Sequence, residues 1–274
     1  MMSVETKTTV TYREMITSLR NLGIERGCPV IAHASLSSFG EVRGGPEALL
    51  GALQASISSL IMPTFTSWPA VIPEVGPEGN AIQYGSGKDS NQLAEFFKPD
   101  MPADKIMGVV PETLRKLPGS YRSSHPLLSF AGLHAETALT AQTLNEPLAP
   151  IRSLAEQGGW VLLIGANHTV NTSIHYAEKL AGRKQFLRWA LTAEGVRECP
   201  GYPGCSEGFQ AIAPRLEMVT HRSIIGKSVI QAIPLKDLVS MVIAYLAEDP
   251  LALLCHRLDC ERCNAVRQAS QGVL

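Results

Sequence analysis

Two short apolar runs on either side of one helical segment constrain the fold of this chain more than any other feature. Residues 29–32 (PVIA) have the pattern of a buried strand ending at His33, and residues 60–62 (LIM) form a second strand, stopped by Pro63. Between them, residues 46–57 predict a helix that begins with a proline, a residue suited to the first helical turn. A strand–helix–strand order implies parallel strands joined by a right-handed crossover. The chain is therefore expected to contain an α/β sheet.

Further segments extend this pattern. Residues 160–165 are the clearest buried strand in the chain, and residues 67–90, rich in Pro and Gly, predict a long loop. Helices are also expected at 11–22, 108–117, 173–181 and 235–247, and strands at 127–131 and 186–191. We expect one α/β domain over residues 1–274. Its central sheet should be mostly parallel and flanked by helices, with a smaller, irregular C-terminal part.

Composition and charge exclude several classes of function. The chain is 45% hydrophobic and 18% charged, which is typical of a globular protein. Its 24 basic and 25 acidic residues form no basic block, which argues against a nucleic-acid partner. No apolar run approaches the roughly 20 residues of a membrane span, and the polar N-terminus does not resemble a signal peptide. We therefore expect a cytoplasmic monomer or homodimer that acts on small molecules and contacts no membrane.

The first of three loops with suggestive chemistry follows the strand at 29–32. Residues 33–40 (HASLSSFG) supply hydroxyl groups, and residues 44–46 (GGP) open the next helix. Ligands of open α/β sheets bind beyond the carboxyl ends of the strands, and free N–H groups at a helix N-terminus favour anions. The loop is therefore either a phosphate site, as a CoA pyrophosphate would need, or a Ser/Gly-rich turn without a ligand.

The second loop contains residues 122–126 (RSSHP). The planar guanidinium of Arg122 could pair with a phosphate group. His125 lies directly before a proline, and a structural histidine in a fixed turn is the simpler interpretation of it.

The third loop follows the strand at 160–165 and carries two histidines, His168 and His175. His175 and Glu178 are three residues apart in an expected helix, so they share one face. A histidine can take a proton near neutral pH, and a carboxylate can fix its tautomer and raise its basicity. The alternative is a surface histidine beside a solvated glutamate.

Five motifs in order resemble those of the aminoglycoside 3-N-acetyltransferase family. They are residues 33–36 (HASL), 44–45 (GG), 62–64 (MPT), 122–126 (RSSHP) and 172–178 (TSIHYAE). The resemblance covers most of the chain from about residue 11 to residue 178. Each motif is weak alone, but their order and spacing together carry the resemblance.

The resemblance implies a fold peculiar to that family, distinct from the GNAT acetyltransferase fold. It also implies acetyl-CoA as donor and direct transfer, in a ternary complex, to the 3-amino group of the 2-deoxystreptamine ring of aminoglycosides, which confers resistance. The residues that it implies for CoA binding are His33, Ala34, Ser35, Leu36, Ser37, Ser38, Phe39, Arg122 and Ser123, with Thr172 near the thioester. His175 would be the general base, with Glu178 and His168 as further catalytic candidates.

One stretch departs from the family pattern. Relatives tend to have an acidic residue before the cysteine-containing segment, whereas residues 199–203 (CPGYP) contain none. Glu178, Glu198 and Glu207 are the open alternatives for that role. Acceptors other than aminoglycosides are therefore a second hypothesis, and a metal-dependent hydrolase that uses His168 and His175 is a third.

The C-terminal cysteines suggest a metal. Cys260 and Cys263 form a CxxC pair, which is a common half of a structural zinc site. The ligand set would then be completed from a distance, with Cys205 as the expected partner and Cys199 or His256 as alternatives. The other interpretation is a group of free cysteines near the end of the chain.

Overall fold

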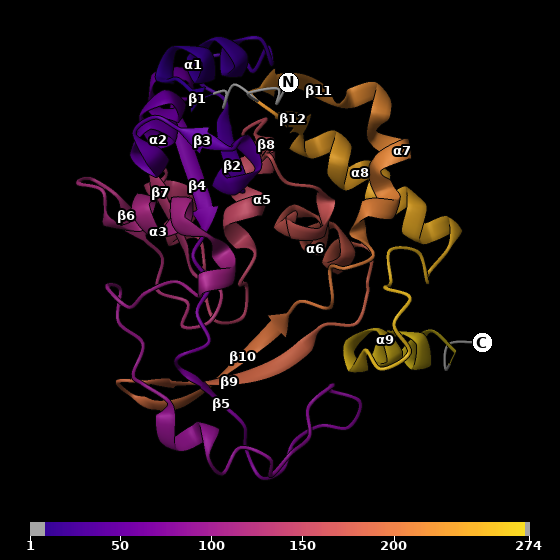
Figure 1. Cartoon of the computed structure of the whole chain (residues 1–274). Coiled ribbons are helices and arrows are strands. Elements are labelled where there is room, and N and C mark those ends of the chain that lie inside the picture. The colour runs from indigo at the N-terminus through magenta and orange to yellow at the C-terminus, as the bar shows by residue number, and fades with distance from the viewer. Residues whose placement is uncertain (1–8, 272–274) are drawn as a thin grey trace, which may run out of the picture.

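A seven-stranded mixed sheet organises the computed structural model, which describes residues 9–271 (Figure 1). The strands are, in spatial order, β11 (His221–Ile225), β12 (Ser228–Pro234), β8 (Trp160–Ile164), β2 (Pro29–Ala34), β4 (Ser59–Pro63), β7 (Phe130–Leu133) and β6 (Tyr121–Arg122). Strand β2 pairs in parallel with β4 and β8, but the outer pairs are antiparallel. The expectation of a mostly parallel sheet is therefore wrong.

The parallel centre contains the strand–helix–strand unit expected from the sequence. The connection from β2 to β4 carries α2 (Gly45–Ser56), with Pro46 in its first turn, where the missing N–H costs no hydrogen bond. Strand β8 pairs with the other edge of β2. Because β2 and β8 are parallel, their carboxyl ends lie side by side at one edge of the sheet.

Helices cover both faces of the sheet because successive strand residues point to opposite sides. Val30 and Ala32 of β2 belong to one apolar cluster, and Ile31 between them belongs to the other. The first cluster lies under α1 (Tyr12–Arg20), α2 and α3 (Val109–Lys116). The second lies under α4 (Glu136–Thr140), α5 (Ala149–Glu156), α6 (Thr172–Leu180), α7 (Ala213–Leu216) and α8 (Leu235–Glu248).

A smaller sheet lies apart from the main one (Figure 1). It consists of β5 (Ala70–Val71), β9 (Phe186–Thr192) and β10 (Gly195–Tyr202), paired antiparallel in the order β10-β9-β5. The segment expected as a loop at 67–90 contributes β5 to this sheet, and its Asn80 exchanges two hydrogen bonds with the backbone of Leu187, at 2.8 and 2.9 Å. A short parallel pair, β1 (Thr9–Val10) and β3 (Glu41–Val42), completes the strands of the described residues.

The C-terminal part is more regular than expected. Strands β11 and β12 extend the main sheet, and α8 packs its apolar residues into the core beneath it. The last helix, α9 (Glu261–Gln271), packs through Val266 and Cys263 in a separate apolar cluster with Phe186 of β9. The described C-terminal part, from β11 to α9, thus packs against both sheets.

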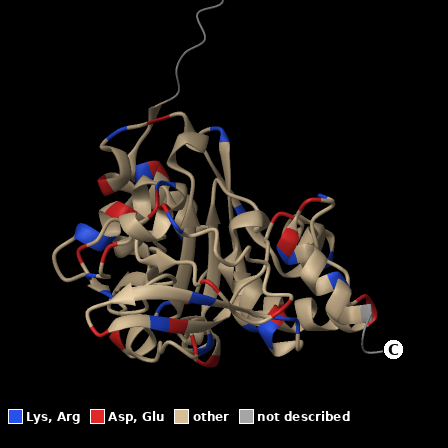
Figure 2. Ribbon diagram, turned by 90° about the horizontal axis from the view of Figure 1, so that it is seen from below, with Lys and Arg blue, Asp and Glu red and all other residues tan. Residues whose placement is uncertain are grey.

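The other expected elements are present with modest shifts. Thr11 caps α1 in a capping box with Glu14, and α3, α6 and α8 lie where helices were expected. The strand expected at 127–131 begins later, at Phe130. No helix in the described part of the chain has the length and apolarity needed to cross a bilayer. In Figure 2 the Lys and Arg positions (blue) and the Asp and Glu positions (red) are interspersed along the ribbon, in keeping with a net charge of −1.

Candidate active site

A cavity of about 790 Å³ opens beyond the carboxyl ends of β2 and β8. This is where an open α/β sheet places its ligands, and the volume suits a small-molecule site. The residues that follow the two strand ends form the first part of its wall, namely residues 35–37 and Ala166 with 169–172. The rest includes Phe65, Asp104, residues 106–109, Pro111, Leu128, His175, residues 202–207 and Arg262.

The end of β2 and the start of the loop after it contribute five residues to this wall, which are His33, Ala34, Ser35, Leu36 and Ser37. Ser38 turns away, because its hydroxyl donates to the Ser35 carbonyl at 2.7 Å and lies 2.9 Å from Ser228 Oγ. Phe39 is buried in the core beneath α2. The structure therefore brings five of these seven predicted residues to the cavity and uses the other two to anchor the loop.

Two helix N-termini face the cavity. Gly108 and Val109 line it at the start of α3, where no side chain caps the helix. Thr172, the first residue of α6, lines it as well, and Asn171 caps α6 by accepting from the Ser173 N–H at 3.2 Å. First-turn N–H groups and the helix dipole both favour an anion. The sequence pointed instead to the start of α2, which does not contribute to this wall.

His175, Glu178 and Arg183 form a hydrogen-bonded chain that ends at the cavity. His175 lines the wall, and its Nδ1 lies 2.8 Å from Glu178 Oε2. The other carboxylate oxygen of Glu178 accepts from Arg183 at 2.6 Å, and the Glu178 side chain is only 3% exposed. Phe209 packs edge-on against the imidazole, with ring centroids 4.6 Å apart. The ring is therefore fixed, and Nε2 is the nitrogen left for a ligand.

The end of α6 explains why Arg183 reaches Glu178. Gly182 has a φ of 77°, a left-handed conformation that glycine adopts without strain. The N–H of Arg183 then bonds the Glu178 carbonyl at 2.9 Å, and that of Gly182 bonds the Lys179 carbonyl at 3.1 Å. This pair of bonds is a Schellman motif, which folds the chain back over the last helical turn. Arg183 also donates to the carbonyls of Pro250 and Ala252, which locks its position.

The second histidine of that segment, His168, lies outside the cavity wall and is 1% exposed. Burial and the nearby charge of Arg222 lower its pKa to about 4. His33, which lines the wall, has a pKa lowered to about 3 by burial and by His168. Both imidazoles are therefore neutral near pH 7. Within the described residues, neither belongs to a group of three or more side chains placed to hold a metal ion.

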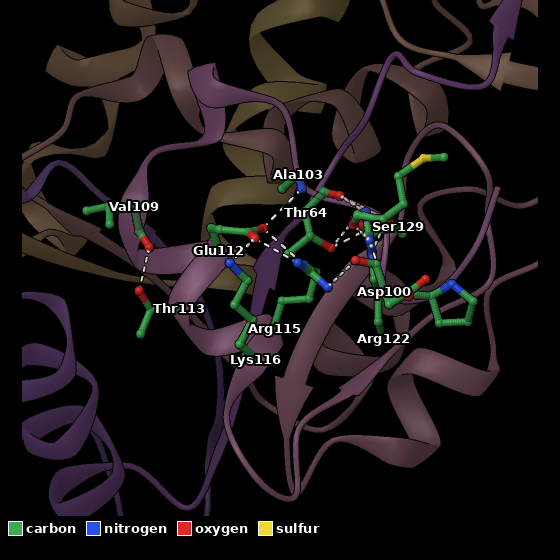
Figure 3. A network of polar contacts seen from close by, with 12 residues as sticks. Thr64, Asp100, Ala103, Val109, Glu112, Thr113, Arg115, Lys116, Arg122 and Ser129 are labelled. Atoms are coloured by element: carbon green, nitrogen blue, oxygen red, sulfur yellow. Dashed lines mark hydrogen bonds and ion pairs between the residues drawn. The ribbon is translucent and has the colours of Figure 1, made fainter. Parts of the chain in front are cut away.

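The guanidinium of Arg122 makes its hydrogen bonds to other residues of the chain (Figure 3). Its guanidinium donates to Ser129 Oγ at 3.0 Å, to the Thr64 carbonyl at 2.7 Å and to the carbonyls of Pro99 and Met101. The neighbouring Ser123 is buried, with its hydroxyl bonded to the backbone of Phe130. Neither residue lines the cavity, although both were expected to contact CoA.

His125 of the same loop is structural. Its Nδ1 accepts from the N–H groups of Leu127 and Leu128 at 3.2 and 3.0 Å. Burial lowers its pKa to about 4, so it too is neutral near pH 7.

Asp104 is a cavity residue that sequence reasoning missed, and an unusually well-held loop positions it. Arg122 binds residues 99 and 101 of that loop, Arg115 donates to the Asp100 carbonyl at 2.9 Å, and Glu112 accepts from the Ala103 N–H at 3.1 Å (Figure 3). Burial alone would raise the pKa of Glu112, but bonds from Arg115, Lys116 and the Ala103 N–H lower it to about 2. Asp104 is therefore positioned in the cavity wall by a loop whose backbone is held by these hydrogen bonds.

The segment 202–207, at the end of β10, forms another part of the wall. It brings Glu207 to the cavity, whereas Glu198 is exposed on β10 and absent from the wall. Glu178, the third candidate, is the carboxylate that holds His175. The same segment contains Cys205, which meets Cys255, Cys260 and Cys263 in a cluster that could hold a metal ion. Cys255 was not among the predicted ligands, although its closeness to the CxxC pair was a usable signal.

A profile of the family described as aminoglycoside 3-N-acetyltransferase matches residues 31–247. The chain belongs to this family. Its match with aminoglycoside N(3)-acetyltransferase VII of Streptomyces paromomycinus has 34% identity over 190 residues, which is 63% of this chain and 61% of that enzyme. The resemblance found in the sequence motifs is thus confirmed at the level of the family.

Solved structures of family members share the fold. The apoenzyme of aminoglycoside acetyltransferase AAC(3)-IVa matches with a TM-score of 0.78 and 28% identity, covering 96% of this chain and 99% of that one. A mutant of AAC(3)-IVa in complex with a gentamicin matches at 25% identity with a TM-score of 0.75 and the same coverage. The binary complex of AAC-IIIb with CoASH has 22% identity and a TM-score of 0.72, covering 88% and 97% of the two chains. Relatives of this chain therefore bind CoA and an aminoglycoside.

Proposed function

We propose that this chain transfers the acetyl group of acetyl-CoA to an amine of an aminoglycoside, at the 3-amino group of the 2-deoxystreptamine ring, with His175 as general base. The observation that carries the proposal is the pairing of His175 with Glu178, which fixes the imidazole at the cavity. The names of its relatives supply the substrate class.

The donor side of the proposal uses the wall between β2, α3 and α6. The hydroxyls of Ser35 and Ser37 and the starts of α3 and α6 line one continuous surface. Uncapped first-turn N–H groups at Val109 suit the pyrophosphate of CoA. Thr172 lies three residues before His175 and so on the same helical face, which suits a position beside the thioester carbonyl.

The acceptor side uses two carboxylates that line the cavity. Aminoglycosides carry several ammonium groups, which carboxylates attract. Asp104 and Glu207 supply negative charge to the cavity wall. They take the place of the acidic residue that the segment 199–203 lacks.

The chemistry is a direct transfer within one ternary complex. His175 Nε2 accepts a proton from the attacking ammonium group, and Glu178 stabilises the resulting imidazolium through Nδ1. The freed amine forms a C–N bond with the thioester carbonyl, and the oxyanion that develops is stabilised by N–H or hydroxyl donors at the start of α6. The C–S bond then breaks and the CoA thiolate takes up the proton from His175, while the nitrogen releases its second proton to solvent and leaves a neutral amide. Binding both substrates in one cavity supplies orientation.

The test measures CoA thiol release from acetyl-CoA with gentamicin-, kanamycin- and neomycin-type acceptors. We expect acceptor-dependent release, with the acetylated position located by NMR of the product. His175→Ala should lower kcat by about 10²–10⁴-fold while acetyl-CoA affinity is kept, because only proton transfer is lost. His256→Ala, at an exposed position outside the cavity, is the matched control. Unchanged turnover in His175→Ala would remove this residue as the base.

The same assay separates the alternatives. If simple polyamines but none of the aminoglycosides caused CoA release, the proposed acetyltransferase activity would stand and the proposed acceptor would be wrong. The metal-dependent hydrolase predicts turnover without acetyl-CoA that a chelator abolishes. The observed geometry favours the acetyltransferase, because His168 is buried away from the cavity and bonds to Asn171 through Nδ1 at 3.3 Å.

A further inference from the structure

Four cysteine sulfurs meet beside the cavity. The Sγ atoms of Cys205, Cys255, Cys260 and Cys263 all lie within 4.8 Å of one another. They come from three separate segments, which are the wall 202–207, the turn after α8 and the start of α9. Each of these cysteines is a free thiol. Four sulfurs converging from three segments form a ligand set, whereas a disulfide would bring together only two.

The spacing of the sulfurs suits one tetrahedral ion. A Zn–S distance of about 2.3 Å places tetrahedral sulfurs about 3.8 Å apart, so the observed cluster needs only a small contraction. Cys255 and Cys263 are buried, while Cys205 and Cys260 are partly exposed. Such a closed set of four thiolates is typical of a structural zinc site and leaves no open position for catalysis. A tetrahedral all-sulfur set also disfavours Mg²⁺ and Ca²⁺, which prefer oxygen.

The backbone is shaped to bring the segments together. Gly208 lies directly against the chain before Cys255, and a Cβ at this glycine would fall 2.4 Å from the Leu253 carbonyl oxygen. Leu253 itself has a φ of 66°, a conformation that costs energy in a leucine and persists only where the surroundings impose it. The close approach and the strained residue both lie where the 202–208 segment meets the turn that carries Cys255.

Cations offset the charge that four thiolates would bring. Arg262 donates to the Gly204 carbonyl at 3.0 Å, and Arg267 donates to the carbonyl of Cys255. Each guanidinium on α9 is thus bound to the backbone of another cysteine segment. Cys260 precedes α9 and Cys263 lies in its first turn, where the helix dipole also stabilises a thiolate.

We propose that Cys205, Cys255, Cys260 and Cys263 bind one Zn²⁺ ion, and that this ion fixes the 202–207 wall of the cavity to α9. Cys205 lies in that wall, and Arg262 of α9 lines the same cavity. The metal therefore acts on the shape of the cavity through Cys205 and takes no part in the chemistry at His175.

The first experiment measures metal in the purified full-length protein, by elemental analysis and native mass spectrometry. We expect one zinc per chain. Single Cys→Ser substitutions at the four positions should each lower zinc content, and Cys28→Ser and Cys199→Ser are the matched controls that should retain it. Exchange of zinc for Co²⁺ in wild type should give the thiolate-to-metal charge-transfer absorption of a tetrahedral all-sulfur site. This spectrum keeps the test valid if a variant fails to fold.

Other results would overturn the assignment. Iron in place of zinc, disulfides in freshly purified protein, or no metal despite added Zn²⁺ would each do so. Retention of full zinc content by Cys255→Ser would reduce the site to the three ligands expected from the sequence and contradict the tetrad.

A second experiment tests the effect on the wall, and this part rests on the proposed function. Cys205→Ser should raise KM for the amine acceptor by several-fold, while KM for acetyl-CoA changes little. An equal rise in KM for the amine acceptor and for acetyl-CoA would show that the metal only stabilises the fold in general. It would refute the proposal that the metal positions the 202–207 wall. If no acceptor is found, zinc content and the cobalt spectrum still decide whether the site exists. Failure of the proposed function is therefore distinguishable from failure of the metal site.

Discussion

Nδ1 of His175 lies 2.8 Å from Glu178, and Arg183 holds the other oxygen of the same carboxylate at 2.6 Å. The carboxylate therefore has one partner on each side and little exposure to water. Because this carboxylate accepts a hydrogen bond from the Nδ1–H group, it favours the imidazole tautomer whose lone pair is on Nε2. The base of the proposed reaction is thus prepared before any substrate binds.

Replacing Glu178 by Gln should disturb this tautomer while preserving shape. An amide can donate to Nδ1 and so favour the imidazole that carries its proton on Nε2. We expect kcat to fall by about 10- to 1,000-fold, since general base catalysis contributes about 10²–10⁴ and part of it should survive. Steady-state kinetics with Glu156→Gln, an exposed change on α5, as control would test this. A kcat equal to that of wild type would show that Glu178 does not orient the base.

Arg122→Lys should reduce stability instead of weakening CoA binding. Lysine cannot reach the four acceptors that the guanidinium binds, so buried carbonyls would lose their partners at about 1–3 kcal/mol for each group. Urea unfolding should therefore show a loss of at least about 2 kcal/mol. If Arg122 instead binds a CoA phosphate, the free energy of unfolding should stay unchanged and KM for acetyl-CoA should rise.

Asp104→Asn should weaken acceptor binding selectively. The amide keeps the Oδ1 acceptor that receives the Ser67 N–H and hydroxyl at 3.0 and 3.1 Å, so the loop should keep its shape while the charge is lost. We expect KM for a polycationic acceptor to rise by roughly two- to tenfold, and less at high salt, as for a partly exposed charge. Asp237→Asn on α8 is the control. An equal rise in KM for acetyl-CoA would contradict the assignment of this wall to the acceptor.

Stability should fall as the solution becomes acidic, through buried histidines. The pKa of His168 is about 4 in the folded protein, against 6.5 as its ordinary value. The unfolded state therefore binds more protons below pH 6.5, so stability is fully present above that pH and declines as pH falls toward 4. His168 should contribute a loss of roughly 1–2 kcal/mol between pH 6.5 and 5.

The matched variant isolates this contribution. Urea unfolding of His168→Gln should show a shallower pH dependence than wild type, whereas Gln54→Ala, an exposed change on α2 that removes no titratable group, should not. His125, with a pKa also near 4, should add a similar slope that persists in both variants. Identical pH profiles for wild type and His168→Gln would show that His168 is not buried as a neutral group.

The sequence was most informative where local pattern decides structure. The apolar runs of β2, β4 and β8 could be recognised as buried strands from their pattern, and the strand–helix–strand order predicted the parallel pairing of β2 with β4. The contact between His175 and Glu178 followed from helical spacing alone. Thr11 and Glu14 likewise marked the first helix through their own hydrogen bonds.

Features set by distant contacts could not be predicted. The direction of β12 depends on its pairing with β8, which lies far away in the sequence, so the mixed character of the sheet was missed. Arg122 looked available for a phosphate because three of its four acceptors, on Thr64, Pro99 and Met101, come near it only through the fold. Asp104 had no motif to mark it, since its place in the cavity depends on how Arg122 and Arg115 hold the preceding loop.

Two parts of the cavity wall are supported by different parts of the fold, and this difference has an evolutionary consequence. The first part is formed by the residues at the ends of β2 and β8. Because these strands are buried in the central core, a change of shape there disturbs the core packing. The second part, the 202–207 wall, is supported by the small sheet and α9. The apolar clusters of these elements are separate from the central core. Mutations there should be tolerated more easily. We expect natural variation in acceptor range to concentrate in this outer wall, while the donor chemistry stays constant across descendants of the same scaffold.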